Sequence, residues 1–220
     1  MKLLSGSGLE IGAMHQPSKI PSHCLIQYLD VVDVDTISEL FPEIKDFKIT
    51  KPDYLGDIEK NSVREITNRQ FDFIILNHVL EHVANPIESI KNIYEGIKVN
   101  GYFVISIPDK NYTFDQLRSI TTFEHLLADY YTGVNSVNND HYVDFLTYVH
   151  PEVFGGKENF TNALNSVRKR REHVHVWDSI TFRKHLDRIF NLLNINMLFL
   201  FESDSYSNHF EYFAVLKKID

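Results

Sequence analysis

The sequence has little cysteine, no excess of positive charge and no long apolar run. Its one cysteine, Cys24, cannot form an intramolecular disulfide, so we interpret it as a buried or incidental thiol. The 22 Lys and Arg against 30 Asp and Glu give a formal net charge of -8, which argues against a general affinity for nucleic-acid backbones. No apolar stretch approaches the roughly 20 residues needed to cross a bilayer, and residues 1–7 are too quickly polar for a secretory signal. We therefore expect a cytoplasmic protein with no membrane span and no nucleic-acid partner.

Glycine is missing where a dinucleotide-binding loop needs it. Such a loop uses Gly-x-Gly-x-x-Gly so that the backbone can approach a pyrophosphate. Counting from Gly12, the second and third glycine positions hold Met14 and Pro17. The Met side chain would obstruct that approach, and Pro17 has no N–H to donate. The loop therefore serves a pyrophosphate poorly, but it can hold a phosphate-free nucleoside such as S-adenosylmethionine.

Two apolar segments are typical of buried parallel strands that end abruptly in polar or glycine residues. They are residues 8–12 (GLEIG) and residues 71–82 (FDFIILNHVLEH). An open α/β sheet binds its ligand at the carboxyl ends of such strands. The two segments therefore predict the two halves of one site for a nucleoside-type cofactor.

The rest of the chain predicts a single α/β domain with a mostly parallel sheet, because strand and helix patterns alternate. The expected strands cover residues 8–11, 25–32, 47–50, 71–77, 102–107, 196–202 and 210–217. The expected helices cover residues 36–41, 60–68, 86–98 and 178–193. Residues 109–177 interrupt this alternation and are rich in Tyr, His, Asn and Asp, with a broken helical segment near 121–131. So long a connection after a strand overhangs the ligand crevice, which indicates an inserted acceptor-binding cap; a surface insertion that only packs against the domain is the alternative.

Three segments resemble the class I S-adenosylmethionine-dependent methyltransferases, and within them the type 11 methyltransferase domain. They are Leu9-Glu10-Ile11-Gly12, residues 71–82, and residues 100–109 (NGYFVISIPD), of which the second is the most specific. The resemblance covers residues 1–110 well and the remainder loosely, and the missing second and third glycines depart from the commonest pattern. It implies a three-layer Rossmann-like sheet of seven strands in the order 3-2-1-4-5-7-6, with the last strand antiparallel. It also implies S-adenosyl-L-methionine as the cofactor and a single methyltransferase domain over residues 1–220.

Several residues near the strand ends are candidates for binding that cofactor. Gly12 lets the chain pass close to the ligand, and Glu10 can orient the loop or accept a hydrogen bond from the ligand's ammonium group. Asp30, at the end of the second strand, can accept both ribose hydroxyls. Asp33 and Asp35 compete for that role, because strand ends are uncertain by a few residues.

The remaining cofactor candidates follow later strands. Asp57 and Ile58 resemble the family's adenine site, in which the carboxylate would accept from the exocyclic amine while the isoleucine packs on the ring; an ordinary Asp-initiated turn is the alternative. Asn77 and His78 leave the strand at residues 71–77, and we expect them to meet the methionine end of the cofactor.

Three residues are candidates for the catalytic base. His82 lies four residues beyond His78, on the same face of a short helix, although it could equally cap that helix. Asp109 directly follows a strand and Pro108, and His141 lies in the inserted segment. For acceptor binding the candidates are Asp109, Tyr112, Arg118, His125, Asp129, His141 and Tyr142.

We do not expect a metal ion. His173 and His175 would share a face of a strand, but no third ligand is evident nearby in the sequence. The basic run at residues 168–171 is interpreted as a solvated face, with binding of a phosphate or sulfate on a nucleotide-linked acceptor as the alternative.

The predicted reaction is methyl transfer to a small-molecule or sugar/glycan acceptor at a hydroxyl oxygen. Deprotonation helps when the acceptor is a neutral hydroxyl, which matches a segment rich in His and Asp. The sugar or glycan class is implied by resemblance alone. Two alternatives stay open: a non-catalytic nucleoside-binding module of the same fold, and an N- or carboxyl-methyltransferase of a small metabolite. The sequence does not indicate an oligomeric state.

Overall fold

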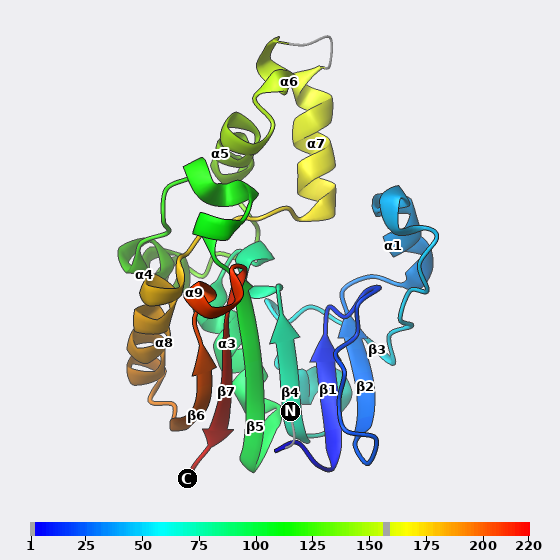
Figure 1. Ribbon diagram of the computed structural model, residues 1–220, viewed down its shortest axis with the longest axis vertical. Helices are drawn as coiled ribbons and strands as arrows, with labels where there is room; N and C mark the ends of the chain where they lie inside the picture. The colour runs from blue at the N-terminus through cyan, green and yellow to red at the C-terminus, as the bar shows by residue number, and fades with distance from the viewer. Residues whose placement is uncertain (1–2, 156–158) are drawn as a thin grey trace.

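The computed structural model describes residues 3–155 and 159–220. Within them, one sheet has the strand order β3-β2-β1-β4-β5-β7-β6, in which β7 runs antiparallel to both of its neighbours. The strands are β1 (Ser7–Ile11), β2 (Leu25–Asp30), β3 (Tyr54–Leu55), β4 (Phe71–Asn77), β5 (Ile97–Pro108), β6 (Met197–Ser203) and β7 (Glu211–Lys218). This order and the antiparallel strand confirm the predicted fold (Figure 1).

Helices connect the strands and form most of the long segment between β5 and α8. The α-helices are α1 (Val34–Leu40), α2 (Val63–Thr67), α3 (Pro86–Glu95), α4 (Phe123–Thr132), α5 (Asn139–Val149), α6 (Glu152–Gly155), α7 (Phe160–Arg170), α8 (Ser179–Leu193) and α9 (Ser205–Asn208). Short 3-10 turns are η1 (Pro42–Ile44), η2 (Leu80–His82), η3 (Lys110–Tyr112) and η4 (Phe114–Leu117). No helix in the described part of the chain is long and apolar enough to span a membrane.

Capping residues fix where the two best-predicted helices begin. The Asn85 side chain accepts from the backbone N–H of Glu88, with Pro86 in the first turn of α3. Asp178 accepts from Thr181 in the same way at the start of α8. α3 ends three residues before the predicted residue 98, because β5 already begins at Ile97.

The third strand is not where the sequence predicts it. Residues 47–50 alternate in polarity, but they are not a strand; instead the Thr50 N–H donates to the Met14 carbonyl at 2.7 Å. The strand that pairs with β2 is the two-residue β3, with Tyr54 opposite Leu29. The predicted position was therefore wrong, because a two-residue strand has no periodicity to detect.

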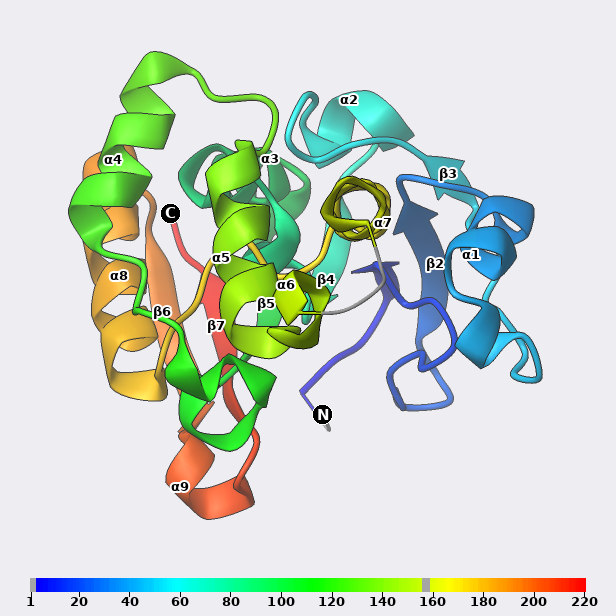
Figure 2. The ribbon, with the colours of Figure 1, turned by 90° about the horizontal axis from the view of Figure 1, so that it is seen from above.

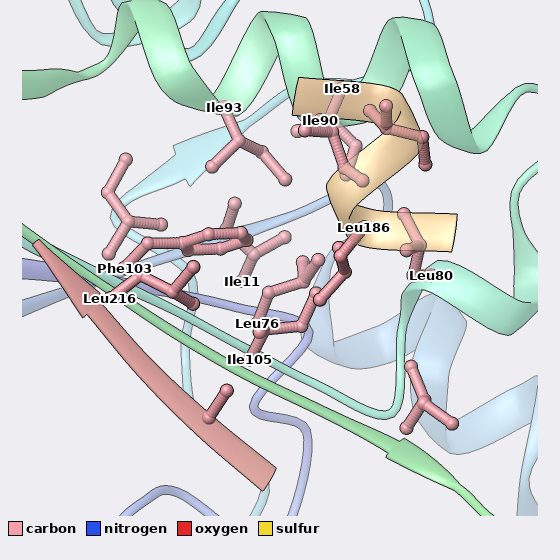
Figure 3. Packing of buried hydrophobic residues seen from close by; sticks show 14 of the residues in the cluster. Ile11, Ile58, Leu76, Leu80, Ile90, Ile93, Phe103, Ile105, Leu186 and Leu216 are labelled. Atoms are coloured by element: carbon pink, nitrogen blue, oxygen red, sulfur yellow. The ribbon is translucent and has the colours of Figure 1, made fainter. Parts of the chain in front are cut away.

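Helices α3, α4 and α8 cover one face of the sheet (Figure 2). On this face lies the main apolar core, in which side chains of the central strands such as Leu76 and Ile105 pack against Ile90 of α3 and Leu186 of α8 (Figure 3). The opposite face carries a smaller cluster that includes Phe73, where residues of the β1–β2 connection pack. Buried on both faces, β4 is apolar at nearly every position, as its sequence predicts.

The long connection between β5 and α8 rises above the carboxyl ends of β1, β4 and β5 (Figure 1). Its helices α5 and α7 enclose their own apolar cluster, which includes Phe145, Val167 and Val174. We call residues 109–177 the excursion.

Candidate functional site

A pocket opens at the carboxyl ends of β1, β2 and β4, where an open α/β sheet binds its ligands. We call it the crevice pocket. Six of the predicted site residues line it: Gly12, Asp30, Asp57, Ile58, His78 and His82. Apolar side chains that include Val32, Ile37 and Phe41 form most of the remaining wall. The structure thus brings these six predicted residues together around one pocket.

The chain leaves β1 in a conformation suited to glycine. Gly12 has φ +72°, and a Cβ added there would lie 2.7 Å from Cγ2 of Val79. Between β1 and β2 the described chain forms no helix. A pyrophosphate would therefore find no helix N-terminus at this turn, which agrees with the phosphate-free ligand predicted from Met14 and Pro17.

Glu10 and Asn77 do not line the crevice pocket but hold the loop beside it. Both carboxylate oxygens of Glu10 accept from the Ser18 N–H at 3.0 Å, and Oε1 also accepts from the Ser18 hydroxyl at 2.7 Å. Asn77 donates to the same hydroxyl at 3.0 Å and accepts from Ser106 at 3.1 Å. Burial raises the pKa of Glu10, although the bonds from Ser18 oppose this. Glu10 thus orients the loop, the first of its two predicted roles.

Asp30, Asp33 and Asp35 were the three candidates for binding the ribose hydroxyls. Of these, Asp30 lines the pocket. Asp33 caps α1, accepting from the Thr36 N–H at 2.9 Å. Asp35 lies in the first turn of that helix. Asp30 accepts from the Val31 N–H at 2.7 Å, and burial raises its pKa. Its carboxylate is therefore the one of the three that a ligand in the pocket can reach.

The predicted adenine-site aspartate has a partner that the sequence did not indicate. Arg171, which follows α7, donates to Asp57 at 2.9 Å and to Glu59 at 3.3 Å. Burial alone would raise the pKa of Asp57, but the hydrogen bond and charge of Arg171 outweigh it and lower that pKa. Arg171 itself lines the crevice pocket. The excursion therefore contacts this pocket through Arg171, which lies 114 positions after Asp57 in the sequence.

Beyond β4 the chain bends sharply and presents two histidines to the pocket. His78 has φ +52°, a strained conformation for a side-chain-bearing residue. Its Nε2 is 2.6 Å from Glu211, and the bond to Glu211 with the charge of Glu81 raises the pKa of His78 against the opposing effect of burial. Burial lowers the pKa of His82, which keeps its imidazole neutral. Between them, Glu81 is almost completely buried.

Asp109 is not placed as a base. Its Oδ2 accepts from the Ser179 N–H at 2.7 Å and from the Ser205 hydroxyl at 2.6 Å, and its Oδ1 accepts from Asn111 at 2.9 Å. Burial would raise its pKa, but these bonds outweigh it and lower that pKa. Asp109 is 1% exposed, and its hydrogen bonds connect the end of β5 to α8 and α9. Because its carboxylate oxygens are buried and occupied by these bonds, we no longer consider it a candidate for the catalytic base.

His141 lies away from the crevice pocket, in a second pocket of about 520 Å³ lined by α4, α5 and the chain at residues 174–176. His125 and Asp129 line the same pocket, 3.2 Å apart. Arg118 also borders it but is committed to Asp115 and Asp144, both at 2.8 Å. Tyr142 is buried in the apolar cluster of the excursion, and Tyr112 packs against His209. Of the predicted acceptor-binding residues, His125, Asp129 and His141 therefore line this second pocket. Arg118 and Tyr142 instead make contacts that hold the excursion together, and Tyr112 contacts the chain after α9.

His173 and His175 do not share one face of a strand. Their segment is not a strand, and the two imidazoles lie in different clusters. His173 contacts His82, with ring centroids 4.8 Å apart, whereas His175 stacks on Trp177. In the basic run at residues 168–171, Arg170 and Arg171 are both paired with carboxylates. These pairs oppose the phosphate-binding alternative.

Comparison with known proteins agrees with the fold. A family model described as a methyltransferase domain matches residues 6–189. No curated protein sequence matches the chain. A solved S-adenosylmethionine-dependent methyltransferase from Clostridium acetobutylicum ATCC 824 has a TM-score of 0.52 and 11% identity, over 100% of this chain and 86% of that one.

Two further structures show the same fold. The CurJ carbon methyltransferase has a TM-score of 0.51 and 13% identity over 100% of this chain, which spans 51% of the CurJ chain. A structure from Rhodobacter sphaeroides described as a putative Zn-dependent alcohol dehydrogenase has a TM-score of 0.55 and 11% identity, over 98% of this chain and 85% of that one. At these identities the likeness shows the fold alone.

Proposed function

The chain belongs to the methyltransferase domain family, and we propose that it moves the methyl group of S-adenosylmethionine to a hydroxyl oxygen of a small molecule or sugar. The observation that carries the proposal is the crevice pocket. On one side of this pocket is the turn at Gly12, which is not followed by a phosphate-binding helix. On the other side are the carboxylates of Asp30, at the end of β2, and Asp57, after β3. A nucleoside with a sulfonium and no phosphate matches these groups.

We assign the cofactor contacts by position in the pocket. Asp30 would accept from the ribose hydroxyls, while Asp57 and Ile58 would contact the adenine. Gly12 would let the backbone approach the sugar and the methionine part. When bound, the sulfonium supplies an activated methyl group, so the protein must chiefly align it with the acceptor. Glu10 and Asn77 would act by positioning the loop.

Of the three predicted bases, His82 lines the crevice pocket. Its Nδ1 is 2.5 Å from the Arg171 carbonyl, which can only accept, so Nδ1 carries the proton and Nε2 keeps its lone pair. We therefore assign to His82 the removal of the proton from the acceptor hydroxyl. The excursion, which supplies that carbonyl, would form the acceptor side of the site.

Calorimetric titration tests the proposal directly. We expect S-adenosylmethionine and its demethylated product to bind, and NAD and ATP not to bind. In a second assay, release of the demethylated product should increase with small alcohols or sugars, and not with amines or carboxylic acids. Preferred binding of NAD or ATP would overturn the cofactor assignment, whereas turnover of amines alone would overturn the hydroxyl assignment.

The second candidate function, a nucleoside-binding module without transfer, predicts binding of the sulfonium compound with no product from any acceptor class. The position of His82 favours an enzyme instead, because this imidazole lines the crevice pocket with its Nδ1 held by the Arg171 carbonyl and its Nε2 free to accept a proton.

A further inference from the structure

Glu81 is a buried carboxylate surrounded by imidazoles. It is 1% exposed, and neither of its oxygens has a hydrogen-bond partner among the described residues. Three imidazole nitrogens face its Oε1: Nδ1 of His78 at 3.8 Å, Nε2 of His82 at 3.8 Å and Nε2 of His173 at 4.0 Å. A buried carboxylate without hydrogen bonds is strongly unfavourable unless a cation compensates it. A positive charge among these four side chains would remove this cost.

The outer nitrogen of each imidazole is held by an oxygen acceptor. The three pairs are His78 Nε2 with Glu211 at 2.6 Å, His173 Nδ1 with Asp115 at 2.6 Å, and His82 Nδ1 with the Arg171 carbonyl at 2.5 Å. Histidines that bind metal ions almost always donate their other ring N–H to a carboxylate or a carbonyl, which fixes the tautomer and aims the ligating nitrogen. All three histidines around Glu81 show this pattern.

We propose that Glu81, His78, His82 and His173 bind one divalent transition-metal ion. Mixed imidazole and carboxylate ligands suit such ions. Ligand atoms of Glu81, His82 and His173 lie within 4.8 Å of one another. Around a tetrahedral zinc ion with bonds of 2.0–2.2 Å, donor atoms are about 3.4 Å apart, so small side-chain rotations would bring these three donors into place. Nδ1 of His78, 3.8 Å from Oε1 of Glu81, would be the fourth donor.

The sequence carries a signal for this site that is separate from the pattern of His173 and His175. Residues 78–82 read His-x-x-Glu-His, a spacing that one class of zinc enzymes uses on a helix. Here the backbone is a bend followed by η2, and the remaining ligand comes from His173, 91 positions after His82. Because that ligand is distant in sequence, no local pattern indicates it.

The position of the site links it to the proposed reaction. His78 and His82 also line the crevice pocket, so the ion would lie at its edge. A bound metal ion lowers the pKa of a hydroxyl that it coordinates. With the ion in place the acceptor hydroxyl would lose its proton to water, and His82, whose Nε2 would then hold the ion, would act as a ligand and not as the base. This consequence rests on the proposed function, but the ion site does not.

Metal binding by the full chain tests the inference. After removal of metal with EDTA, equilibrium dialysis against Zn²⁺ should give one ion per chain, and Co²⁺ should produce visible absorption bands at the same stoichiometry. We expect His173→Gln and Glu81→Gln each to lower the Zn²⁺ affinity at least about 100-fold. Glu211→Gln, which removes only the support of His78, should lower it about 10- to 100-fold. His125→Gln is the matched control, because it removes a histidine of the second pocket.

The results separate the ion site from the methyl transfer. Circular dichroism of each metal-free variant checks its fold, and if Glu81→Gln does not fold, His173→Gln and Glu211→Gln decide. Absence of stoichiometric Zn²⁺ binding, or binding that His173→Gln leaves intact, overturns the inference. Titration of the same samples with S-adenosylmethionine reports separately on the proposed function. Zn²⁺ binding without cofactor binding would overturn only that function.

Discussion

Gly12 is the residue whose replacement should affect cofactor binding most directly. At φ +72°, a residue with a Cβ costs about 1–2 kcal/mol, and the new Cβ would lie 2.7 Å from Val79, which lines the pocket. The strain lowers the stability, whereas the clash changes the pocket, because Val79 must move out of its wall. We therefore expect Gly12→Ala to weaken S-adenosylmethionine binding about tenfold, which corresponds to about 1.4 kcal/mol. Isothermal titration calorimetry measures the change.

Gly133 provides a matched control for that prediction. It also has a left-handed backbone, with φ +67°, but a Cβ there would meet no atom within 4 Å. Gly133→Ala should therefore lower the stability of the protein by a similar strain energy and leave the cofactor affinity unchanged. Equal loss of affinity in both variants would show that backbone strain, and not the pocket, is the cause.

Asp30 and Asp33 give a second test at single residues. A hydrogen bond to a charged group contributes about 1.5–3 kcal/mol, so Asp30→Ala should weaken cofactor binding about 10- to 100-fold. Asp33→Ala removes a helix cap outside the pocket and should cost about 1 kcal/mol of stability with unchanged affinity. Unfolding by urea and calorimetry separate the two effects. If Asp33→Ala affected binding more than Asp30→Ala, the ribose assignment would be wrong.

Site residues could be predicted where a single strand places them. Asp30 is the last residue of β2, and Gly12 and His78 directly follow β1 and β4. The carboxyl ends of parallel strands meet at one edge. Arg171 and His173 could not be predicted in the same way. Their contacts with Asp57 and Glu81 join residues about 90 or more positions apart, and no local pattern records which distant segments fold together.

At the level of elements, the sequence indicated long buried strands and strongly amphipathic helices best. β4 was predicted with its observed bounds, and α8 to within one residue of its start. α7 was missed because its apolar face is narrow: only Ala163 and Val167 are buried in it. Its position is set by tertiary contacts that include the ion pairs of Arg170 and Arg171.

The docking of α7 through Arg171 leads to a kinetic prediction. Arg171 lines the crevice pocket while it bonds to Asp57 and Glu59, and we expect its side chain to obstruct entry of the cofactor. We expect Arg171→Ala to raise both the association and the dissociation rate of S-adenosylmethionine, and to change the affinity less than either rate. A residue that only contacts the bound ligand would change mainly the dissociation rate. Stopped-flow fluorescence measures both rates.

Arg168 is the control for this experiment. It lies on the same helix but is exposed, so Arg168→Ala removes an equal charge without opening the pocket. Unchanged rates in Arg168→Ala with faster rates in Arg171→Ala would support the barrier. A slower association rate in Arg171→Ala would contradict it.

At the scale of the whole molecule, the histidines have a marked effect on stability because several are buried without a charge partner. Burial lowers the pKa of His175 well below its usual value, with the charges of His141 and His125 adding to the effect. His185, 6% exposed on α8, has its pKa lowered to about 4 by burial and by the charge of Arg188. Both imidazoles are therefore neutral in the folded protein near neutral pH.

The folded protein should lose stability as the pH falls from about 6.5 to about 4. In that range an unfolded His185 binds a proton while the folded one does not, so the free energy of unfolding decreases with decreasing pH. Each pKa unit corresponds to about 1.4 kcal/mol. Between pH 6.5 and 4.5, His185→Gln should therefore lose about 2 kcal/mol less stability than the unchanged protein, as measured by urea unfolding at each pH. His23→Gln, which removes an exposed histidine, should keep the original pH dependence. A pH dependence in His185→Gln equal to that of the unchanged protein would mean that His185 is protonated in the folded state, and that the packing of α8 against α4 admits the charge.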